Sequence, residues 1–193
     1  MEQTRISREL RDQSRVLVLE SADEDTGAVP CVTALGRDGS TEQHVLHIAF
    51  EQSPAEVVDD WRTSHGDLPA SLAVIAPTAE EPGGSLPADV HVTHVAADDL
   101  TGVGIAVGRY LDRWDGESTT VCLDSLTALL DRVEEDRAFR FLHTLTGRFV
   151  AADAAGHVHL DPTTQDDRTV ATLATLFDTI VRRGDEGWRV EQG

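Results

Sequence analysis

The sequence predicts an α/β fold, in which a mostly parallel central sheet carries helices on both of its faces. Short apolar runs of strand length alternate with helical patterns along most of the 193 residues. Hydrophobic residues make up 40% of the chain, which is enough for a single buried core. Such alternation implies right-handed crossovers between parallel strands. We expect a polar N-terminal extension over residues 1–14 and one domain over residues 15–193.

Six apolar runs are predicted to form the strands of this sheet. The first, at 15–20, is short and mainly apolar, which suits a strand that is buried on both faces. The others lie at 44–50, 71–76, 90–95, 119–124 and 157–161. A small edge strand is also predicted at 188–190, close to the end of the sequence.

Helices are predicted between these strands. Pro54 suits the first turn of a helix whose inner stripe is Val57, Val58 and Trp61. Apolar residues then recur at helical spacing over 100–114, which is a strongly amphipathic pattern.

The second half of the chain continues this helical periodicity. It predicts a helix over 126–155 with an interruption near Glu134, and a last helix marked by apolar residues from 170 to 181. The remaining predicted segments are a short helix at 29–35, a turn at 37–41 and an exposed connector at 77–87.

The chain contains no lysine. All 16 of its basic residues are arginines, against 35 acidic residues, and the net charge is −19. Dense carboxylates without lysine suit concentrated salt, where a Debye length of about 3 Å screens the self-repulsion. We therefore predict an intracellular protein of an extremely halophilic archaeon. The same charge argues against binding to a nucleic-acid backbone.

Neither the termini nor the cysteines indicate another environment. The N-terminal residues lack the apolar core of a signal peptide, and no apolar run reaches the roughly 20 residues that a membrane helix needs. We expect a soluble, cytoplasmic protein without a membrane partner. The two cysteines, Cys31 and Cys122, have no metal-ligand spacing, and we interpret them as small buried hydrophobic residues.

Three stretches resemble the KaiC branch of the RecA-like ATPases. Residues 16–27 (Val-Leu-Val-Leu-Glu-Ser-Ala-Asp-Glu-Asp-Thr-Gly) lie where that family has its first strand and phosphate loop. Residues 45–54 are similar to the second strand, which ends in a pair of acids followed by Ser/Thr-Pro. Residues 120–129 are similar to the Walker B strand, which ends in an aspartate. The chain also looks like a lysine-less haloarchaeal branch with a degenerate phosphate loop. The resemblance implies a RecA-like three-layer α/β/α sandwich.

The phosphate loop departs from the family pattern. ATP binding in this family requires a glycine-rich loop whose lysine contacts the β- and γ-phosphates, and this chain has no lysine to supply. Three acids, at 23–25, lie where the triphosphate would bind, and Pro30 removes a backbone donor. The residues left to contact a nucleotide are Asp25, Thr26 and Gly27. We therefore expect no cofactor, and in particular no ATP with Mg²⁺.

Two acids remain at positions that the resemblance associates with catalysis. Glu51 corresponds to a residue that activates the attacking water, but Gln52 replaces the second acid of the pair. Asp124 corresponds to a residue that holds Mg²⁺, and we retain it as the candidate metal ligand. The alternative is structural: an aspartate at a strand end, followed by Ser125, can cap the next helix. On that interpretation both acids are relics and the chain has no catalytic residue.

The histidines have a less specific pattern. His157 and His159 alternate on one face of a predicted strand, whereas His91 and His94 point to opposite faces of another. Neither pair has a third ligand at a recognisable spacing, so we expect hydrogen-bonded histidines in the core or at a sheet edge rather than zinc ligands. Asp161, before Pro162, is either a functional strand-end residue or part of a turn.

Two functions from different classes follow. The first is a catalytically inactive RecA/KaiC-like domain with a regulatory or assembly role, which acts by binding a protein partner or further copies of itself. The alternative is a nucleotide- or small-molecule-binding sensor, or an ATPase with a non-standard phosphate site. The first is our working hypothesis, because a homo-oligomer of this chain also lacks the lysine.

Overall fold

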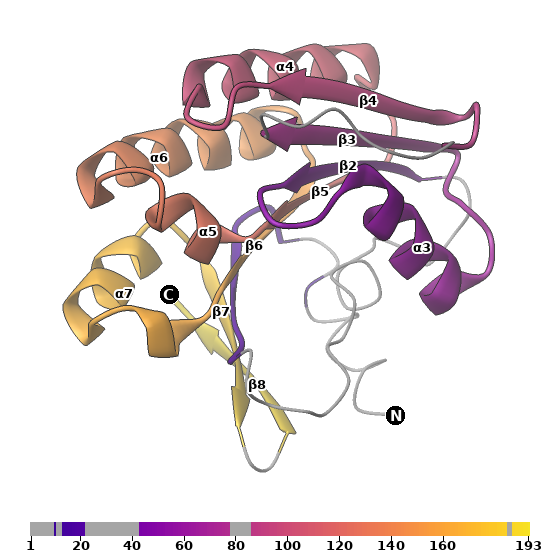
Figure 1. The fold of residues 1–193 in the computed structure, drawn as a ribbon. Helices are drawn as coiled ribbons and strands as arrows, with labels where there is room; N and C mark the ends of the chain where they lie inside the picture. Colours follow the sequence, from indigo (N-terminus) through magenta and orange to yellow (C-terminus); the bar gives the residue numbers. More distant parts are fainter. Residues whose placement is uncertain (1–9, 11–12, 22–42, 78–85, 185–186) are drawn as a thin grey trace.

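The computed structural model describes residues 10, 13–21, 43–77, 86–184 and 187–193. In this part of the chain the strands form one eight-stranded sheet, and helices lie on both of its faces (Figure 1). This architecture confirms the predicted α/β class and the mostly parallel sheet. The predicted segments at 29–35 and 37–41, and most of the connector at 77–87, lie outside the described residues.

Seven neighbouring strands of the sheet run parallel, and the eighth, β8, closes an antiparallel hairpin with β7. In spatial order they are β4 (Val90–Val95), β3 (Ser71–Pro77), β2 (His44–Ala49), β5 (Thr119–Asp124), β6 (Ala155–Leu160), β1 (Val16–Leu19), β7 (Thr179–Gly184) and β8 (Gly187–Gln192). All four residues of β1 are buried, as expected for a strand with both faces covered.

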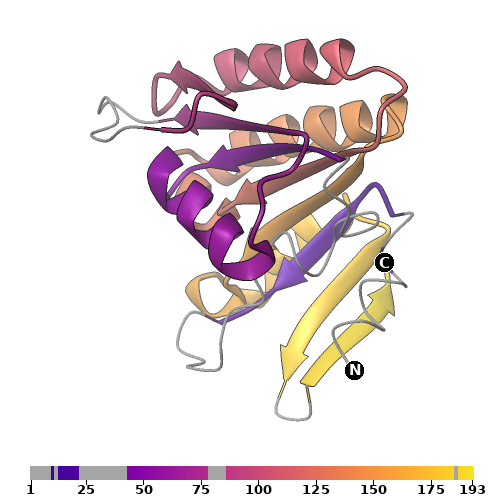
Figure 2. The same cartoon turned by 90° about the vertical axis from the view of Figure 1, so that its right-hand side faces the viewer.

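The helices are distributed unequally over the two faces. One face carries α3 (Pro54–His65), and the other carries α4 (Leu100–Arg113), α5 (Leu126–Leu130), α6 (Glu135–Ala151) and α7 (Asp167–Ala174) (Figures 1 and 2). The start of α3 agrees with the prediction, because Pro54 occupies its first turn and Ser53 and Glu56 form a reciprocal capping box. None of the described helices is long and apolar enough to cross a membrane.

The face with four helices holds the main core. Every second strand residue points into it, including Leu46 and Ile48 of β2 and Val121 and Leu123 of β5. The other face has two smaller apolar clusters. One lies under α3, around Trp61. The second lies between β1 and the β7–β8 hairpin and includes Leu10. Leu10 is only 1% exposed, although it belongs to the predicted polar extension.

Two predicted helix boundaries were wrong. The pattern over 126–155 is indeed broken near Glu134, but the second part, α6, ends at Ala151. Asp153 takes a left-handed conformation with φ 50°, and the amide of Ala154 donates to the carbonyl of Phe149, so the chain leaves the helix and enters β6.

The last helix is also shorter than predicted, because Ile180 and Val181 belong to β7. Arg15 makes two hydrogen bonds to the carboxylate of Asp178, at 2.8 and 2.7 Å. The next residues then pair with β1, with Ile180 beside Leu17 and Val181 beside Val18. Because Ile and Val are β-branched, they favour this strand over an extra helical turn. The edge strand predicted at 188–190 is confirmed as part of β8.

Candidate functional site

The carboxyl ends of β2 and β5 bring Glu51 and Asp124 together. These neighbouring parallel strands place Asp124 beside Ala49, two residues before Glu51. The hydroxyl of Ser125 donates to the Glu51 carboxylate at 2.8 Å and accepts from the amide of Ala128 at 3.1 Å. Ser125 is therefore the N-cap of α5, and the predicted capping role of Asp124 was wrong. Asp124 is the last residue of β5, and Ser125 follows it directly. Because Asp and Ser are both common helix caps, the local sequence did not show which of these two residues caps α5.

The carboxylate of Asp124 lies in an environment that disfavours its charge. Burial raises the pKa of Asp124 above its ordinary value; His47 opposes this rise, whereas Glu51 and Asp60 add to it. Gln52, which replaces the second acid of the family pattern, donates to Asp60 at 2.6 Å. Glu51, Asp60 and Asp124 thus form a group of three acids, in which Glu51 accepts a hydrogen bond from Ser125 and Asp60 accepts one from Gln52.

Arginines near this edge of the sheet are occupied by structural contacts. Arg132 donates to the carbonyl oxygens of Pro77 at 2.9 Å and Phe50 at 2.7 Å. Arg183 lies 3.7 Å from the carboxylate of Glu20 at the end of β1. The loop candidates Asp25, Thr26 and Gly27 lie outside the described residues, as do the acids at 23 and 24.

A group of histidines lies on the sheet face that α3 covers in part. His47 of β2 pairs with Cys122 of β5, and Cys122 pairs with His157 of β6, so the three form a row across the sheet. His159 is two residues further along β6, on the same face. Its ring centroid is 5.3 Å from that of His157. We call His47, His157 and His159 the histidine cluster.

The spacing of His157 and His159 in the sequence indicated no third ligand. In the structure, one ligand atom from each of Cys122, His157 and His159 lies within 4.8 Å of the other two, but Cys122 is disulfide-bonded. His47, which the sequence did not single out, is buried, and neither of its ring nitrogens has a hydrogen-bond partner among the described residues. The interpretation of His91 and His94 as edge histidines agrees with their exposure on β4. Strand order was the missing information, since His47 and His157 are distant in sequence and share one row of the sheet only because β2 and β6 flank β5.

Cys122 is buried, as predicted, with an exposure of 1%. It is also bonded in a disulfide, which the sequence analysis did not predict. Spacing in the sequence does not reveal such a bond, because a disulfide requires only that two sulfur atoms meet in space. The other cysteine, Cys31, lies outside the described residues.

Burial also determines the protonation of the histidine cluster. It lowers the pKa of His47 to about 4, with Asp124 opposing and His159 adding to the shift. Burial likewise lowers the pKa of His159 to about 4 and that of His157 well below its ordinary value. The three imidazoles are therefore neutral at pH 7, which is the form in which histidine binds metal ions.

Asp161, directly after β6, takes part in a turn. Its carboxylate accepts from the amide of Thr163 at 2.8 Å and caps the short 3-10 helix η1 (Pro162–Thr164). This is the turn chemistry that was one of the two predicted alternatives for Asp161.

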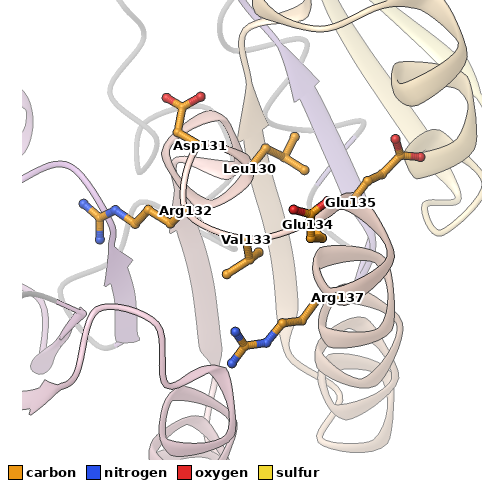
Figure 3. Close-up of a pocket in the computed structure, with 7 residues that line it drawn as sticks. All are labelled: Leu130, Asp131, Arg132, Val133, Glu134, Glu135 and Arg137. Atoms are coloured by element: carbon orange, nitrogen blue, oxygen red, sulfur yellow. The ribbon is translucent and has the colours of Figure 1, made fainter.

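Two hollows lie beside the main core. The first, of about 390 Å³, surrounds the turn between α5 and α6. Figure 3 shows Arg132 and Glu135 directed to opposite sides of this turn. The second, which we call the α4–α6 groove, has a volume of about 330 Å³. Its lining consists of apolar residues, threonines and three arginines: Leu100, Thr101, Gly104, Ile105, Arg137, Arg140, Phe141, Thr144, Leu145 and Arg148.

Residues 13–182 match the Family of unknown function (DUF7504), so the chain belongs to this family. Comparison with curated proteins gives no match.

Solved structures with the same fold include two archaeal proteins. A protein from Pyrococcus horikoshii OT3, studied as project PH0250, is similar with a TM-score of 0.64 and 10% identity over 100% of this chain and 93% of its own. The flagellar accessory protein FlaH from Methanocaldococcus jannaschii gives a TM-score of 0.53 and 12% identity over 89% of this chain and 71% of its own. The fold is therefore RecA-like, as the sequence resemblance implied.

Proposed function

We propose that this chain is a RecA-like domain without ATPase activity, which acts in a regulatory or assembly role by binding a protein partner in the α4–α6 groove. The observation that carries the proposal is the composition of this groove. In a chain with 35 acids and 16 bases, three arginines and no acid line it.

The residues at the carboxyl edge of the sheet do not fit ATP with Mg²⁺. A triphosphate needs a cation in the phosphate loop, and the chain has no lysine. Near this edge, Arg132 donates to two carbonyl oxygens, and Arg183 forms an ion pair with Glu20 at 3.7 Å. Moving Arg132 to a nucleotide would leave both carbonyl oxygens without this donor. We therefore derive no step through a bound nucleotide.

The α4–α6 groove combines apolar area with fixed positive charge. Arg137 donates to the carbonyl of Asp98 at 2.7 Å and Arg148 to that of Gly104 at 3.0 Å, which positions both side chains along the groove. Ile105 is 49% exposed at its rim and adds apolar area to the groove. A guanidinium that is held by a neutral carbonyl keeps its charge for a carboxylate of a partner.

These features favour an acidic amphipathic segment of another protein as the occupant. Its apolar side chains would cover Ile105 and Phe141, and its carboxylates would pair with the three arginines. A second copy of this chain is the other source of acidic surface, and the oligomeric state distinguishes the two.

The proposal is tested with a labelled amphipathic helical peptide rich in glutamate and leucine. Fluorescence anisotropy should show binding to the full chain, loss of binding in Arg140→Glu, and no binding of a matched peptide with lysine in place of glutamate. Arg109→Glu is the control, because Arg109 is exposed on α4 but does not line the groove. Equal binding of both peptides, or equal loss in both variants, would contradict the proposal. Light scattering that shows a dimer broken by Arg140→Glu would instead assign the groove to self-association.

A further inference from the structure

We propose that Cys122, His157 and His159 form a redox-controlled binding site for a divalent transition-metal ion such as Zn²⁺, and that the site becomes competent when the disulfide of Cys122 is reduced. The three residues come from neighbouring strands, Cys122 from β5 and both histidines from β6. In the oxidised chain the sulfur of Cys122 is held in a disulfide and supplies no thiolate. Reduction restores the thiol, so the reduced site offers one thiolate and two imidazoles.

Strand pairing brings the three side chains to one face of the sheet. Cys122 is paired with His157 in the register of β5 and β6, and His159 is two residues further along β6, so all three point to the same face. The residues between them, Leu123 and Val158, point into the main core on the other face. The site therefore lies on the face opposite α4 and α6 and is independent of the α4–α6 groove (Figure 1).

The ligand atoms are close enough for one ion. One ligand atom from each of these three side chains, the sulfur of the cysteine and a ring nitrogen of each histidine, lies within 4.8 Å of the other two. With Zn–S of about 2.3 Å and Zn–N of about 2.0–2.1 Å, such atoms are roughly 3.3–3.6 Å apart around a tetrahedral ion. Rotations of the three side chains are sufficient to close this difference. Three protein ligands leave the fourth position for water.

His159 gives an independent indication of a ligand at this place. Its Nε2 atom is buried and has no hydrogen-bond partner among the described residues. Buried polar atoms are almost always satisfied, and a metal ion satisfies an imidazole nitrogen as well as a hydrogen bond does. The Nδ1 atom of the same ring lies 4.0 Å from the Glu20 carboxylate. Because a carboxylate behind a histidine ligand fixes its orientation and tautomer, Nε2 is the atom that faces the ion.

The charges around the reduced site suit a divalent cation. Burial lowers the pKa values of His157 and His159, so both imidazoles are neutral at pH 7. The thiol of Cys122 loses its proton when a metal ion binds. This thiolate and the carboxylate of Glu20 then offset the charge of the ion. Arg183 lies 3.7 Å from the other oxygen of Glu20, so the carboxylate is placed between the guanidinium and His159.

Activation of the site is a two-electron reduction. A dithiol reductant supplies two electrons and two protons: the S–S bond of the chain breaks, two cysteine thiols form, and the reductant becomes a disulfide. Where thiols are kept reduced, protein disulfides are rare, and those that occur are usually catalytic or redox-sensing. The reduced chain therefore binds the metal ion, and oxidation of Cys122 to the disulfide blocks the site.

The test is a Co²⁺ titration of the full, tag-free, metal-free chain in molar KCl, before and after reduction with a dithiol that is then removed under nitrogen. Mass spectrometry after alkylation establishes the thiol state. Co²⁺ replaces Zn²⁺ in tetrahedral sites, where it absorbs strongly in the visible range. The reduced chain should bind one Co²⁺, with a further thiolate-to-cobalt band in the near ultraviolet, and Zn²⁺ should displace it. The oxidised chain should show no saturable absorption.

Three variants separate the ligands from the disulfide. Cys31→Ser removes the only other cysteine of the sequence, so that Cys122 has no disulfide partner in its own chain. This variant should bind Co²⁺ without a reductant, and it keeps the test decisive if the disulfide resists reduction. Cys122→Ser should abolish the near-ultraviolet band, and both Cys122→Ser and His159→Gln should weaken binding by the reduced chain at least about tenfold.

Matched controls come from the edge strand β4, where His91 and His94 are exposed. His91→Gln and His94→Gln should bind Co²⁺ as the reduced, unaltered chain does. Circular dichroism in EDTA establishes that each variant is folded; if His159→Gln is not, Cys122→Ser decides. The proposal is overturned if neither the reduced chain nor Cys31→Ser shows saturable absorption, if the oxidised chain or Cys122→Ser binds equally well, or if His91→Gln loses as much as His159→Gln.

Discussion

The two faces of the central sheet differ in what they bury. The face under α4, α5, α6 and α7 is one continuous apolar core, with fully buried side chains such as Leu123, Leu142 and Phe149. The opposite face has an apolar cluster under α3 and another beside the β7–β8 hairpin. The histidine cluster and Asp124 lie on this second face.

The two faces of the sheet therefore contribute differently to the stability of the fold. Burial of apolar area stabilises the fold, whereas a buried polar group without a partner costs stability. A chain selected only for stability would place aliphatic residues at His47 and His159, as it does on the other face. Polar groups that are buried at such a cost are candidates for binding or catalysis. The helical core therefore stabilises the fold, whereas the buried histidines of the second face lower its stability.

The largest expected effect lies in the helical core. Phe149 is fully buried and packs against Gly156 of β6, where no side chain larger than hydrogen fits. Phe149→Ala should reduce the free energy of unfolding by about 3–5 kcal/mol, because it removes apolar area and leaves a cavity. Urea unfolding in molar KCl measures this loss. Val150→Ala, at a neighbouring exposed position, should change it by less than about 0.5 kcal/mol. Similar losses in both variants would contradict the assignment.

The next effect is the pH dependence of the second face in metal-free protein. The pKa values of His47 and His159 are lowered from 6.5 to about 4 in the folded state. Their contribution to stability is therefore complete above pH 6.5 and is lost as the pH falls towards 4, because the unfolded state takes up protons first. The loss should be on the order of 1–3 kcal/mol per histidine.

Asp124 acts in the opposite direction, since its pKa is raised and its protonation favours the folded state. Urea unfolding in EDTA between pH 7 and 4 should show the net acid-induced loss, and His159→Gln should make the curve flatter. A stability that does not change over this range, or a curve unaltered by His159→Gln, would show that the histidines are not desolvated as described.

A smaller effect separates Ser125 from Asp124. Ser125→Ala should destabilise the chain by about 0.5–2 kcal/mol, because Ser125 caps α5 and donates to Glu51. Asp124→Asn should be neutral or slightly stabilising at pH 7, since it removes a charge that burial disfavours. Thermal melts of both variants provide the comparison. A larger loss in Asp124→Asn than in Ser125→Ala would restore Asp124 as a structural anchor.

The sequence was sufficient for the fold because its signals were local. Continuous apolar runs identified β1, β2 and β5, and the helical spacing after Leu100 identified α4. It failed at Ile180 and Val181, whose apolar pattern fits a helix or a strand and was decided by pairing with β1. The site was only half predictable. Glu51 and Asp124 were identified through the family resemblance, whereas the histidine cluster depends on strand order and the disulfide of Cys122 on contact in space.

The central claim, that this RecA-like domain has lost its nucleotide chemistry, is tested most directly by isothermal titration of ATP with Mg²⁺ into the full chain in molar KCl. We expect no binding heat and no phosphate release, because the chain has no lysine and the described arginines near the strand ends are engaged elsewhere. A micromolar affinity for ATP would contradict the claim and favour the nucleotide-binding sensor.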